Sequence, residues 1–409
     1  MTSDVMHATR LEISGDELEL TLEARSVATT VTVTVSDGGL SEHPDFLLPA
    51  TLLPAMKAGL GLSLPSGVSP RLLAGSDEVQ NIASLCSDDY RRIPIDAVPR
   101  DPERSTATST ACFFSGGVDT WSTTLKFLDE IDVLVFMDGV FHRPGWDAVT
   151  ENAHAAAREL GKPLLSVTTD LKRLANFAYA RVPFPDYGGN LVAAIALLLQ
   201  HRFNRVLVAG SFSYAALPMR AGSHPLVDPL WSTEALEIVH DGAELTRSMK
   251  VARLAESDIA MRRLHVCSRA GPGSKAEDVP GLNCGRCGKC LRTMINLRAV
   301  GALSRCETLP DELDLELVEQ LPMKDDRDLA FAMDHLRTLE PGHDPELEAA
   351  VRTSLSRAEI GEIGISDYLS MKQRLADCEK QNRMYRESLG FRVSALLHKL
   401  ALRRTGRRS

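Results

Sequence analysis

The sequence predicts an α/β protein built on a doubly wound parallel sheet of five strands, and two patterns support this. Short apolar runs typical of buried strands occur at 111–114, 132–137, 163–168, 205–210 and, more weakly, 237–240. Helical stretches separate these runs, and the most apolar of them extends from Tyr187 to His201. Strands that alternate with helices at this pitch form a parallel sheet with helices on both faces.

In such a sheet, ligands bind at the carboxyl ends of the strands. Polar and glycine residues follow four of the predicted strands directly, at Ser115–Thr120, Asp138-Gly139, Thr169-Asp170 and Gly210-Ser211. We therefore expect Asp138, Gly139, Gly210 and Ser211 to border a ligand site formed around residues 115–120.

The residues that flank this central part, 106–306, are expected to form three further parts. Residues 1–105 alternate apolar and polar side chains at period two and predict a small β-rich domain. Residues 307–365 predict a helical extension. Residues 366–409 predict a short coiled coil, which indicates a homodimer, and a basic tail that either contacts an anionic surface or is a frayed end.

Composition places the protein in a broad class. The 409 residues are 25% charged and 44% hydrophobic, as in soluble globular proteins. A net charge of −9 argues against a nucleic-acid partner, and no apolar run approaches eighteen residues. Eight cysteines with no sign of a signal peptide favour the reducing cytoplasm over a disulfide scaffold.

The first predicted strand is followed by Ser115-Gly116-Gly117-Val118-Asp119-Thr120. A glycine turn between a strand and a helix directs backbone N–H groups and the helix dipole at an anion. The two hydroxyls add donors, and Asp119 suits Mg²⁺, which neutralises bound phosphates. The stretch is neither a Walker A loop nor a dinucleotide fingerprint. The alternative is a turn that needs glycine for its geometry alone.

A second motif, Cys284-Gly-Arg-Cys287-Gly-Lys-Cys290, follows Cys267 by seventeen residues. Two-residue spacers let thiolates converge on one ion, and four sulfurs complete the tetrahedral shell of structural zinc. An iron–sulfur cluster uses the same ligands and is the minority alternative. The spacing predicts a metal site in preference to free buried cysteines.

Residues 115–120 resemble the S-G-G-x-D-S/T loop of the N-type ATP pyrophosphatases, the PP-loop superfamily. Within it, zinc-containing 7-cyano-7-deazaguanine synthases pair this loop with a late cysteine and then C-x-x-C-x-x-C, in the order found here over residues 108–300. The resemblance implies an adenine nucleotide alpha hydrolase-like sheet with a zinc-bound cap, and it implies ATP, Mg²⁺ and Zn²⁺ as ligands.

Single positions extend the resemblance. Lys250 matches a family lysine near the ATP phosphates, with Arg247 added, although a solvated helix charge is the alternative. Gly139 and His142 keep part of a Y-G-Q-x-H segment, so His142 is a candidate substrate contact or a structural histidine. Asn190, where the family has R-N, is a substrate contact or a helix N-cap.

Other segments depart from the family. Residues 211–216 lack the family's N-A-x-D pattern, and a proline-stiffened segment, 222–232, follows. This departure predicts a substrate other than 7-carboxy-7-deazaguanine. His224 and Asp228 are expected to line its pocket as an acid–base or orienting pair, or else to lie in a solvated turn.

The resemblance implies an AMP-forming ligase. A carboxylate or carbonyl oxygen of a small molecule would be adenylated with release of pyrophosphate, and ammonia, an amine or a sulfur donor would then displace AMP. Asp119, Lys250, Arg247, His224 and Asp228 are the residues expected to act in the reaction. The alternatives are a sulfur transferase that uses the same adenylation, and a non-catalytic nucleotide- or partner-binding module with structural zinc.

Overall fold

A computed structural model describes residues 4–102, 105–138, 146–217, 222–267, 281–323, 326–339 and 342–357. Its strands are β1 Val5–Ser14, β2 Glu17–Ala24, β3 Val27–Val35, β4 Gly61–Ser63, β5 Ile95–Asp96, β6 Ser109–Phe113, β7 Val133–Asp138, β8 Leu164–Thr169, β9 Phe203–Ala209 and β10 Glu237–Asp241. Its α-helices are α1 Leu47–Ala58, α2 Pro70–Cys86, α3 Val118–Lys126, α4 Trp146–Leu160, α5 Phe184–Leu198, α6 Arg247–Leu254, α7 Asp258–Arg263, α8 Gly288–Ala299, α9 Leu315–Glu319, α10 Asp326–Thr338 and α11 Pro345–Ser356.

The five strands expected from the central apolar runs lie side by side in the order β10-β9-β6-β7-β8, and every neighbouring pair is parallel. From β6 the chain builds outward through β7 to β8 and then returns to the other side of β6 to add β9 and β10. The strand order therefore reverses between β6 and β9. In open α/β sheets such a reversal leaves a crevice at the carboxyl ends of the strands.

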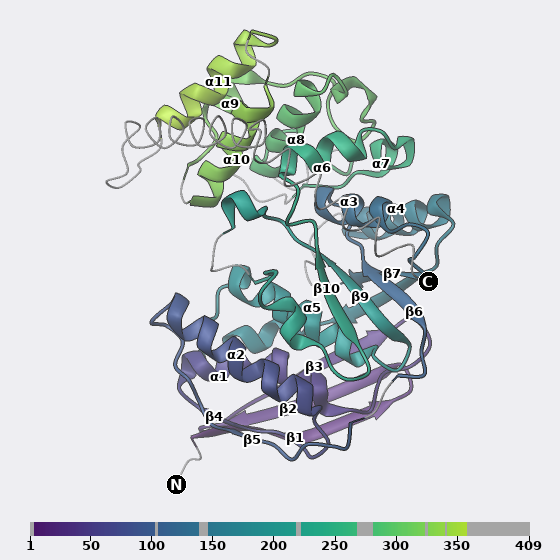
Figure 1. Ribbon diagram of the computed structural model, residues 1–409, viewed down its shortest axis with the longest axis vertical. Helices are drawn as coiled ribbons and strands as arrows, with labels where there is room; N and C mark the ends of the chain where they lie inside the picture. Colours follow the sequence, from purple (N-terminus) through teal and green to yellow (C-terminus); the bar gives the residue numbers. More distant parts are fainter. Residues whose placement is uncertain are drawn as a thin grey trace, which may run out of the picture.

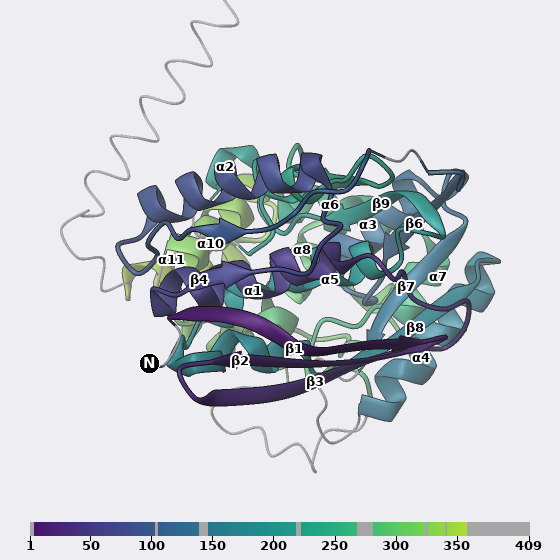
Figure 2. The ribbon, with the colours of Figure 1, turned by 90° about the horizontal axis from the view of Figure 1, so that it is seen from below.

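The expectation of a five-stranded sheet is corrected, because the sheet has ten strands. β3 pairs antiparallel with β8, with Val33 opposite Thr169, and β2, β1, β4 and β5 continue the sheet beyond β3. Figure 2 shows β1, β2 and β3 running side by side along this extension. The first hundred residues thus enlarge the central sheet and do not form a separate one. Without β3, the backbone N–H and C=O groups along the outer edge of β8 would be unpaired.

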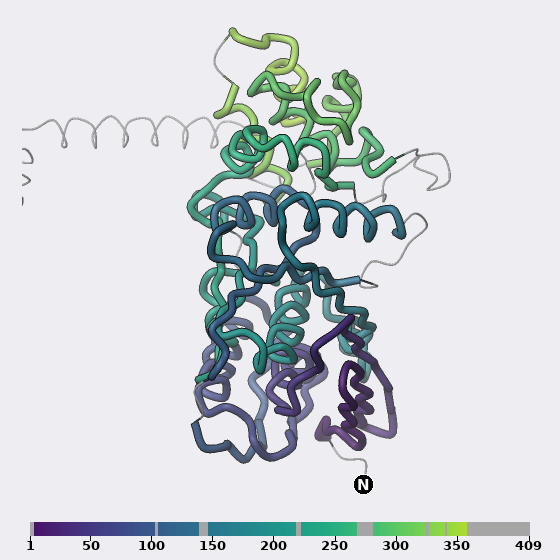
Figure 3. Tube along the Cα trace, turned by 90° about the vertical axis from the view of Figure 1, so that its right-hand side faces the viewer, coloured from purple at the N-terminus to yellow at the C-terminus, as the bar shows by residue number. Residues whose placement is uncertain are grey.

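Alternate residues of the central strands face two different cores. Ala111 and Phe113 of β6 pack with α1 and α5, whereas Cys112 between them packs with α3, α6 and α8. This alternation follows from the period of two along a strand. Figure 1 shows α1, α2 and α5 on one side of the strands and α3, α4 and α6 on the other, the doubly wound arrangement. The N-terminal strands and the C-terminal helices lie at opposite ends of the molecule (Figure 3).

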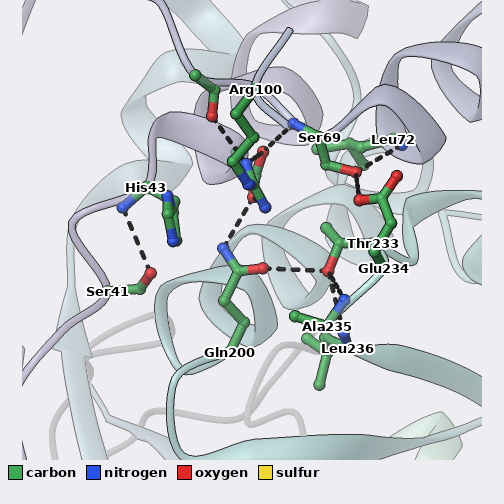
Figure 4. Close-up of polar contacts among 12 residues, drawn as sticks. Ser41, His43, Ser69, Leu72, Arg100, Gln200, Thr233, Glu234, Ala235 and Leu236 are labelled. Carbon is green, nitrogen blue, oxygen red and sulfur yellow. Dashed lines mark hydrogen bonds and ion pairs between the residues drawn. The ribbon is translucent and has the colours of Figure 1, made fainter. Parts of the chain in front are cut away.

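A buried polar cluster fastens the N-terminal residues to the central sheet (Figure 4). The carboxylate of Asp45, which is fully buried, accepts hydrogen bonds from Gln200 at 2.9 Å and from the backbone of Ser69 at 2.8 Å. Arg100 forms an ion pair with the same carboxylate at 2.8 Å. Gln200 follows α5 and in turn accepts from Thr233 at 3.1 Å. Because a buried carboxylate needs this full set of partners, the cluster joins segments that are distant in the sequence.

Candidate functional site

The loop at residues 115–120 connects β6 to α3 and lies beside the strand-order reversal. Gly116 has φ of +73°, a left-handed conformation that favours glycine. Gly117 is the extended N-cap of α3, and the hydroxyl of Thr120 donates to its carbonyl at 3.1 Å. As a glycine, Gly117 offers no side-chain cap to the helix. The first turn of α3 therefore presents backbone N–H groups of the kind that bind phosphate.

Asp119 lies in this first turn and faces three donors. Its carboxylate is 3.4 Å from Nζ of Lys250 and 3.3 Å from Nη1 of Arg247, and Ser211 Oγ donates to it at 3.3 Å. Lys250 is buried and also donates to the carbonyl oxygen of Gly210 at 2.5 Å. The structure thus brings together Asp119, Lys250, Arg247, Gly210 and Ser211, all of which the sequence placed at the site.

A cavity of about 640 Å³ opens over the loop. Its lining joins the loop residues to segments from β9, α6, α8 and α10. Among the residues that line it are Ser115, Gly117, Val118, Asp119, Thr120, Ser211, Phe212, Ser223, Arg247, His265, Cys267, Lys289, Arg292, Arg327, Asp328 and Phe331. This volume is within the range of small-molecule and cofactor sites.

The wall of the cavity that α8 and α10 form was not predicted. Phe331 of α10 stacks on Phe212, with ring centroids 5.7 Å apart, and the guanidinium groups of Arg292 and Arg247 lie 5.1 and 5.8 Å from its ring. Arg292 also forms an ion pair with Asp328. For α10 the sequence predicted only a helical extension, and which face of this helix meets the cavity depends on packing between distant helices.

The four cysteines of the second motif converge as the spacing predicted. Their sulfur atoms all lie within 4.8 Å of one another, with Cys287 to Cys290 at 3.5 Å, Cys284 to Cys290 at 3.8 Å and Cys287 to Cys267 at 4.0 Å. A tetrahedral shell with zinc–sulfur bonds of about 2.3 Å has sulfur–sulfur edges of about 3.8 Å. The cluster could therefore hold a metal such as zinc. Contacts with the neighbouring thiols, that of Cys267 first, lower the pKa of Cys284.

Asn283 fixes the backbone that carries Cys267. Its Oδ1 accepts from the N–H groups of Val266 at 2.8 Å and Cys267 at 3.0 Å, and its Nδ2 donates to the carbonyls of Leu264 and Thr308. The N–H group of the intervening His265 donates to the carbonyl of Gly116 at 2.8 Å. One segment thus touches both the four cysteines and the glycine turn.

His224 and Asp228 lie close together but not on the cavity wall, which corrects the expectation that they line the pocket. Both are buried, and a carboxylate oxygen of Asp228 accepts from the backbone of His224 at 3.2 Å. Burial is the largest cause that lowers the pKa of His224. Asp228 accepts closer hydrogen bonds from Ser223 and His240, two residues that the sequence did not single out. The two residues do not lie in a solvated turn either, because both are buried and Trp231 of the same segment packs into the core.

The remaining predicted residues have other positions. Asn190 is buried inside α5, where its amide donates to the carbonyl of Pro49 at 3.2 Å. It neither lines the cavity nor caps the helix, whose N-cap is Pro183, so both of its expected roles are corrected. Asp138 ends β7 and accepts from the indole N–H of Trp146. Gly139 and His142 lie outside the described residues.

Comparison with protein-family models, with curated proteins and with solved structures yields no match. Among the described residues, no helix is long and apolar enough to cross a membrane. The case for a function therefore depends on the geometry of the site.

Proposed function

We propose that the protein is an AMP-forming, ATP-dependent ligase of the N-type ATP pyrophosphatase class. It adenylates a carboxylate or carbonyl oxygen of a small molecule. Ammonia, an amine or a sulfur donor then attacks the activated carbon and displaces AMP. The observation that carries the proposal is the Ser115–Thr120 loop at the strand-order reversal, which faces Lys250 and Arg247 across Asp119 and opens into the cavity.

Each part of this site suits cleavage between the α and β phosphates of ATP. The N–H groups at the start of α3 and the hydroxyl of Ser115, which lies 3.4 Å from that of Thr120, are donors for the leaving pyrophosphate. Lys250 and Arg247 add positive charge at the same place. Donors and cations fixed in advance stabilise negative charge as it develops, without reorganisation at the moment of reaction.

Asp119 is the residue that would hold Mg²⁺, which supplies charge neutralisation on the phosphates when bound. The ion is commonly held by one or two carboxylates together with substrate phosphates. The contacts of Asp119 with Lys250 and Arg247, at 3.4 and 3.3 Å, are longer than typical charge-assisted hydrogen bonds of about 2.7–2.9 Å. The carboxylate oxygens therefore retain capacity for a cation.

The zinc expected at the four cysteines has a structural role in this proposal. Four sulfurs occupy every position of a tetrahedral ion, whereas catalytic zinc keeps one position open for water or substrate. The metal would hold residues 264–267 against Gly116 and so support the loop from outside.

A sulfur transferase that carries its sulfur on Cys112 is less well supported. Cys112 lies in β6, is fully buried, and burial raises the pKa of its thiol to about 12. Nucleophilic sulfur carriers need an accessible thiolate. If sulfur is the group transferred, it would come from a free donor.

The proposal is tested by product analysis and pyrophosphate exchange with ATP, a panel of carboxylic acids, ammonium and sulfide. We expect AMP and pyrophosphate as products. Asp119→Asn should lower the Mg²⁺-dependent rate by about 10²-fold or more, because it removes a charge that organises the phosphates. Asp129→Asn, the same change at an exposed position beyond α3, is the matched control. ADP and phosphate as products would refute the assignment.

Gly117→Val tests the phosphate-binding role of the turn separately. Gly117 has φ of −83°, which any residue adopts, and an added Cβ has no neighbour closer than 3.4 Å. The variant should therefore fold, yet its side chain would occupy the space above the turn. We expect calorimetry to show loss of ATP binding, with thermal stability equal to that of the wild type. Unchanged ATP affinity would show that the turn does not bind the phosphates, and would favour the alternative of a non-catalytic module.

A further inference from the structure

Ser223, Asp228 and His240 form a hydrogen-bonded cluster behind the cavity wall. Ser223 Oγ donates to Oδ2 of Asp228 at 2.6 Å, and Nδ1 of His240 lies 2.7 Å from the same oxygen. Ser223 Oγ and His240 Nδ1 are 3.4 Å apart. Two donors thus converge on one carboxylate oxygen.

The cluster is buried at one end and open to the cavity at the other. The side chains of Asp228 and His240 are each 3% exposed, whereas Ser223 belongs to the cavity lining. A proton that leaves a bound molecule can reach Asp228 through the hydroxyl of Ser223. Among the described residues, Nε2 of His240 is buried without a hydrogen-bond partner, so the closest hydrogen bond of its ring is the one from Nδ1 to Asp228.

The backbone around Ser223 is held in place by close packing. The neighbouring Gly222 donates to the carbonyl of Pro185 at 2.5 Å, and a Cβ at Gly222 would lie 2.5 Å from that same oxygen. A Cβ at Gly189 of α5 would lie 1.5 Å from the carbonyl oxygen of Gly222. Because neither glycine has room for a side chain, the backbone next to Ser223 packs closely on α5.

The cluster also adjoins the residues that hold Asp119. The ring of His240 packs against Gly210, where an added Cβ would lie 2.2 Å from Nε2. Gly210 accepts from Lys250 through its carbonyl, and the next residue, Ser211, donates to Asp119. The end of β9 therefore supports the phosphate loop on one side and the buried cluster on the other.

We propose that Ser223 and Asp228 form a proton relay for a nitrogen nucleophile, an inference that rests on the proposed adenylation. The nitrogen of ammonia attacks the acyl carbon of the adenylate, a carbon–nitrogen bond forms, and AMP leaves with the electrons of the carbon–oxygen bond. One N–H proton passes to Ser223 Oγ as the hydroxyl proton of Ser223 passes to Oδ2 of Asp228. His240 is a positioning residue that holds this carboxylate.

The relay selects among the nucleophile classes that the proposed function leaves open. Ammonia or a primary amine must lose a proton to give a neutral amide, and ammonium must lose another before it can attack. Hydrosulfide is already an anion and needs no base of this kind. A buried carboxylate behind a hydroxyl in the cavity therefore fits ammonia or an amine as the co-substrate.

The test measures adenylation and amide formation separately, in the wild type and in Ser223→Ala. The substrate is whichever carboxylic acid supports pyrophosphate exchange in the wild type. Exchange reports adenylation, and amide formation with ammonium reports the second step. Positioned general bases contribute about 10²–10⁴-fold, so Ser223→Ala should lower amide formation by about 10²-fold and leave exchange close to wild type.

Two further variants guard against a structural explanation. Asp228→Asn should reproduce the selective loss, since it removes the proton acceptor. Ser232→Ala is the matched control, because Ser232 is buried nearby, accepts from the backbone of Ile238 at 3.0 Å and does not line the cavity. It should leave the ratio of the two half-reactions unchanged.

Several results would overturn the relay. They are unchanged amide formation in Ser223→Ala, an equal loss in both half-reactions, an equal loss in Ser232→Ala, or preference of the wild type for hydrosulfide over ammonium. Absence of pyrophosphate exchange in the wild type with every acid would instead overturn the adenylation, and the relay with it.

Discussion

At the scale of single residues, the end of β9 is the most constrained point of the site. Gly210 places its carbonyl on Lys250 while the ring of His240 packs on its Cα. No other residue type fits, because any side chain would meet the imidazole and the carbonyl of Asp241, 3.2 Å from the added Cβ. The requirement for glycine here comes from close approach, not from a left-handed backbone.

Gly210→Ala should therefore lower the free energy of unfolding by about 1–3 kcal/mol, the usual effect of overpacking. Denaturant titration followed by circular dichroism measures this. Gly188→Ala is the matched control, since an added Cβ in that helical position makes only ordinary contacts, at 3.5 and 3.6 Å with the ring of Phe184. It should be neutral or stabilising by about 0.5–1 kcal/mol, because alanine favours helix. Equal stability of both variants would contradict the proposed packing of His240.

His335 of α10 is the buried residue whose titration should affect folding. Its Nδ1 is 2.7 Å from Oδ1 of Asn296, and burial, followed by the nearby Arg292 and Arg247, lowers its pKa from 6.5 to about 3. Between pH 6.5 and about 3, the unfolded chain therefore binds a proton at His335 that the folded chain does not bind. The resulting stability is complete above pH 6.5 and is lost as the pH falls toward 3.

We expect this linkage to contribute a slope of up to about 1.4 kcal/mol per pH unit to the free energy of unfolding between pH 6 and 4. In His335→Gln that part of the slope should disappear, whatever the overall loss of stability. Denaturant titrations at several pH values measure the slope of the free energy of unfolding against pH in the wild type and in the variant. Identical slopes would show that His335 is not buried in neutral form.

At the scale of elements, the segment 264–267 links the four-cysteine cluster to the glycine turn. Asn283 satisfies two N–H groups and one carbonyl of this segment, and the N–H group of His265 reaches Gly116. α10 is joined to α6 in a similar way, because Asp334 accepts from the backbone and hydroxyl of Ser248, each at 2.8 Å. Both walls of the cavity are thus fixed by buried side-chain hydrogen bonds.

We expect one zinc per chain in freshly purified protein, and its loss in Cys287→Ser. Structural zinc contributes folding free energy directly, so a chelator should lower the melting temperature of wild type and expose the segments around the four cysteines to protease. Cys306→Ser is the matched control, because Cys306 is buried in the same half of the molecule but lies outside the cluster. Metal analysis with thermal denaturation decides the matter, and full zinc content in Cys287→Ser would refute the ligand set.

At the scale of the whole molecule, the ten-stranded sheet makes the N-terminal residues part of one fold with the central strands. β3 covers the edge of β8, and one hydrophobic core contains Val31 of β3, Leu52 of α1 and Ile195 of α5. A sheet edge and an apolar helix face would be exposed without residues 1–105.

A chain that begins at residue 106 should consequently be insoluble or bind hydrophobic dyes, and the full chain should unfold in a single transition. Expression of the fragment, with dye binding and denaturation of the full chain, measures this. A stable, soluble fragment with native circular dichroism would show instead that residues 1–105 form an independent domain, the organisation that the sequence predicted.

The sequence by itself determined the local elements and the two motifs. Period-two and apolar runs predict β1 to β3 and β6 to β10, because side-chain alternation is a local property. Cysteine spacing predicts the sulfur cluster, since the ligands are brought together by short turns. The glycine turn, Asp119 and Lys250 were likewise readable from short patterns.

Only the tertiary structure decided how these elements combine. An alternating strand reads the same whether it belongs to a separate sheet or joins the edge of β8, so the pairing of β3 was not predictable. Phe331 and Ser223 line the cavity, and His240 lies behind it against Asp228, all from segments without a motif. The amide of Asn190 donates to Pro49. These positions depend on contacts between residues far apart in the chain, which short-range patterns do not record.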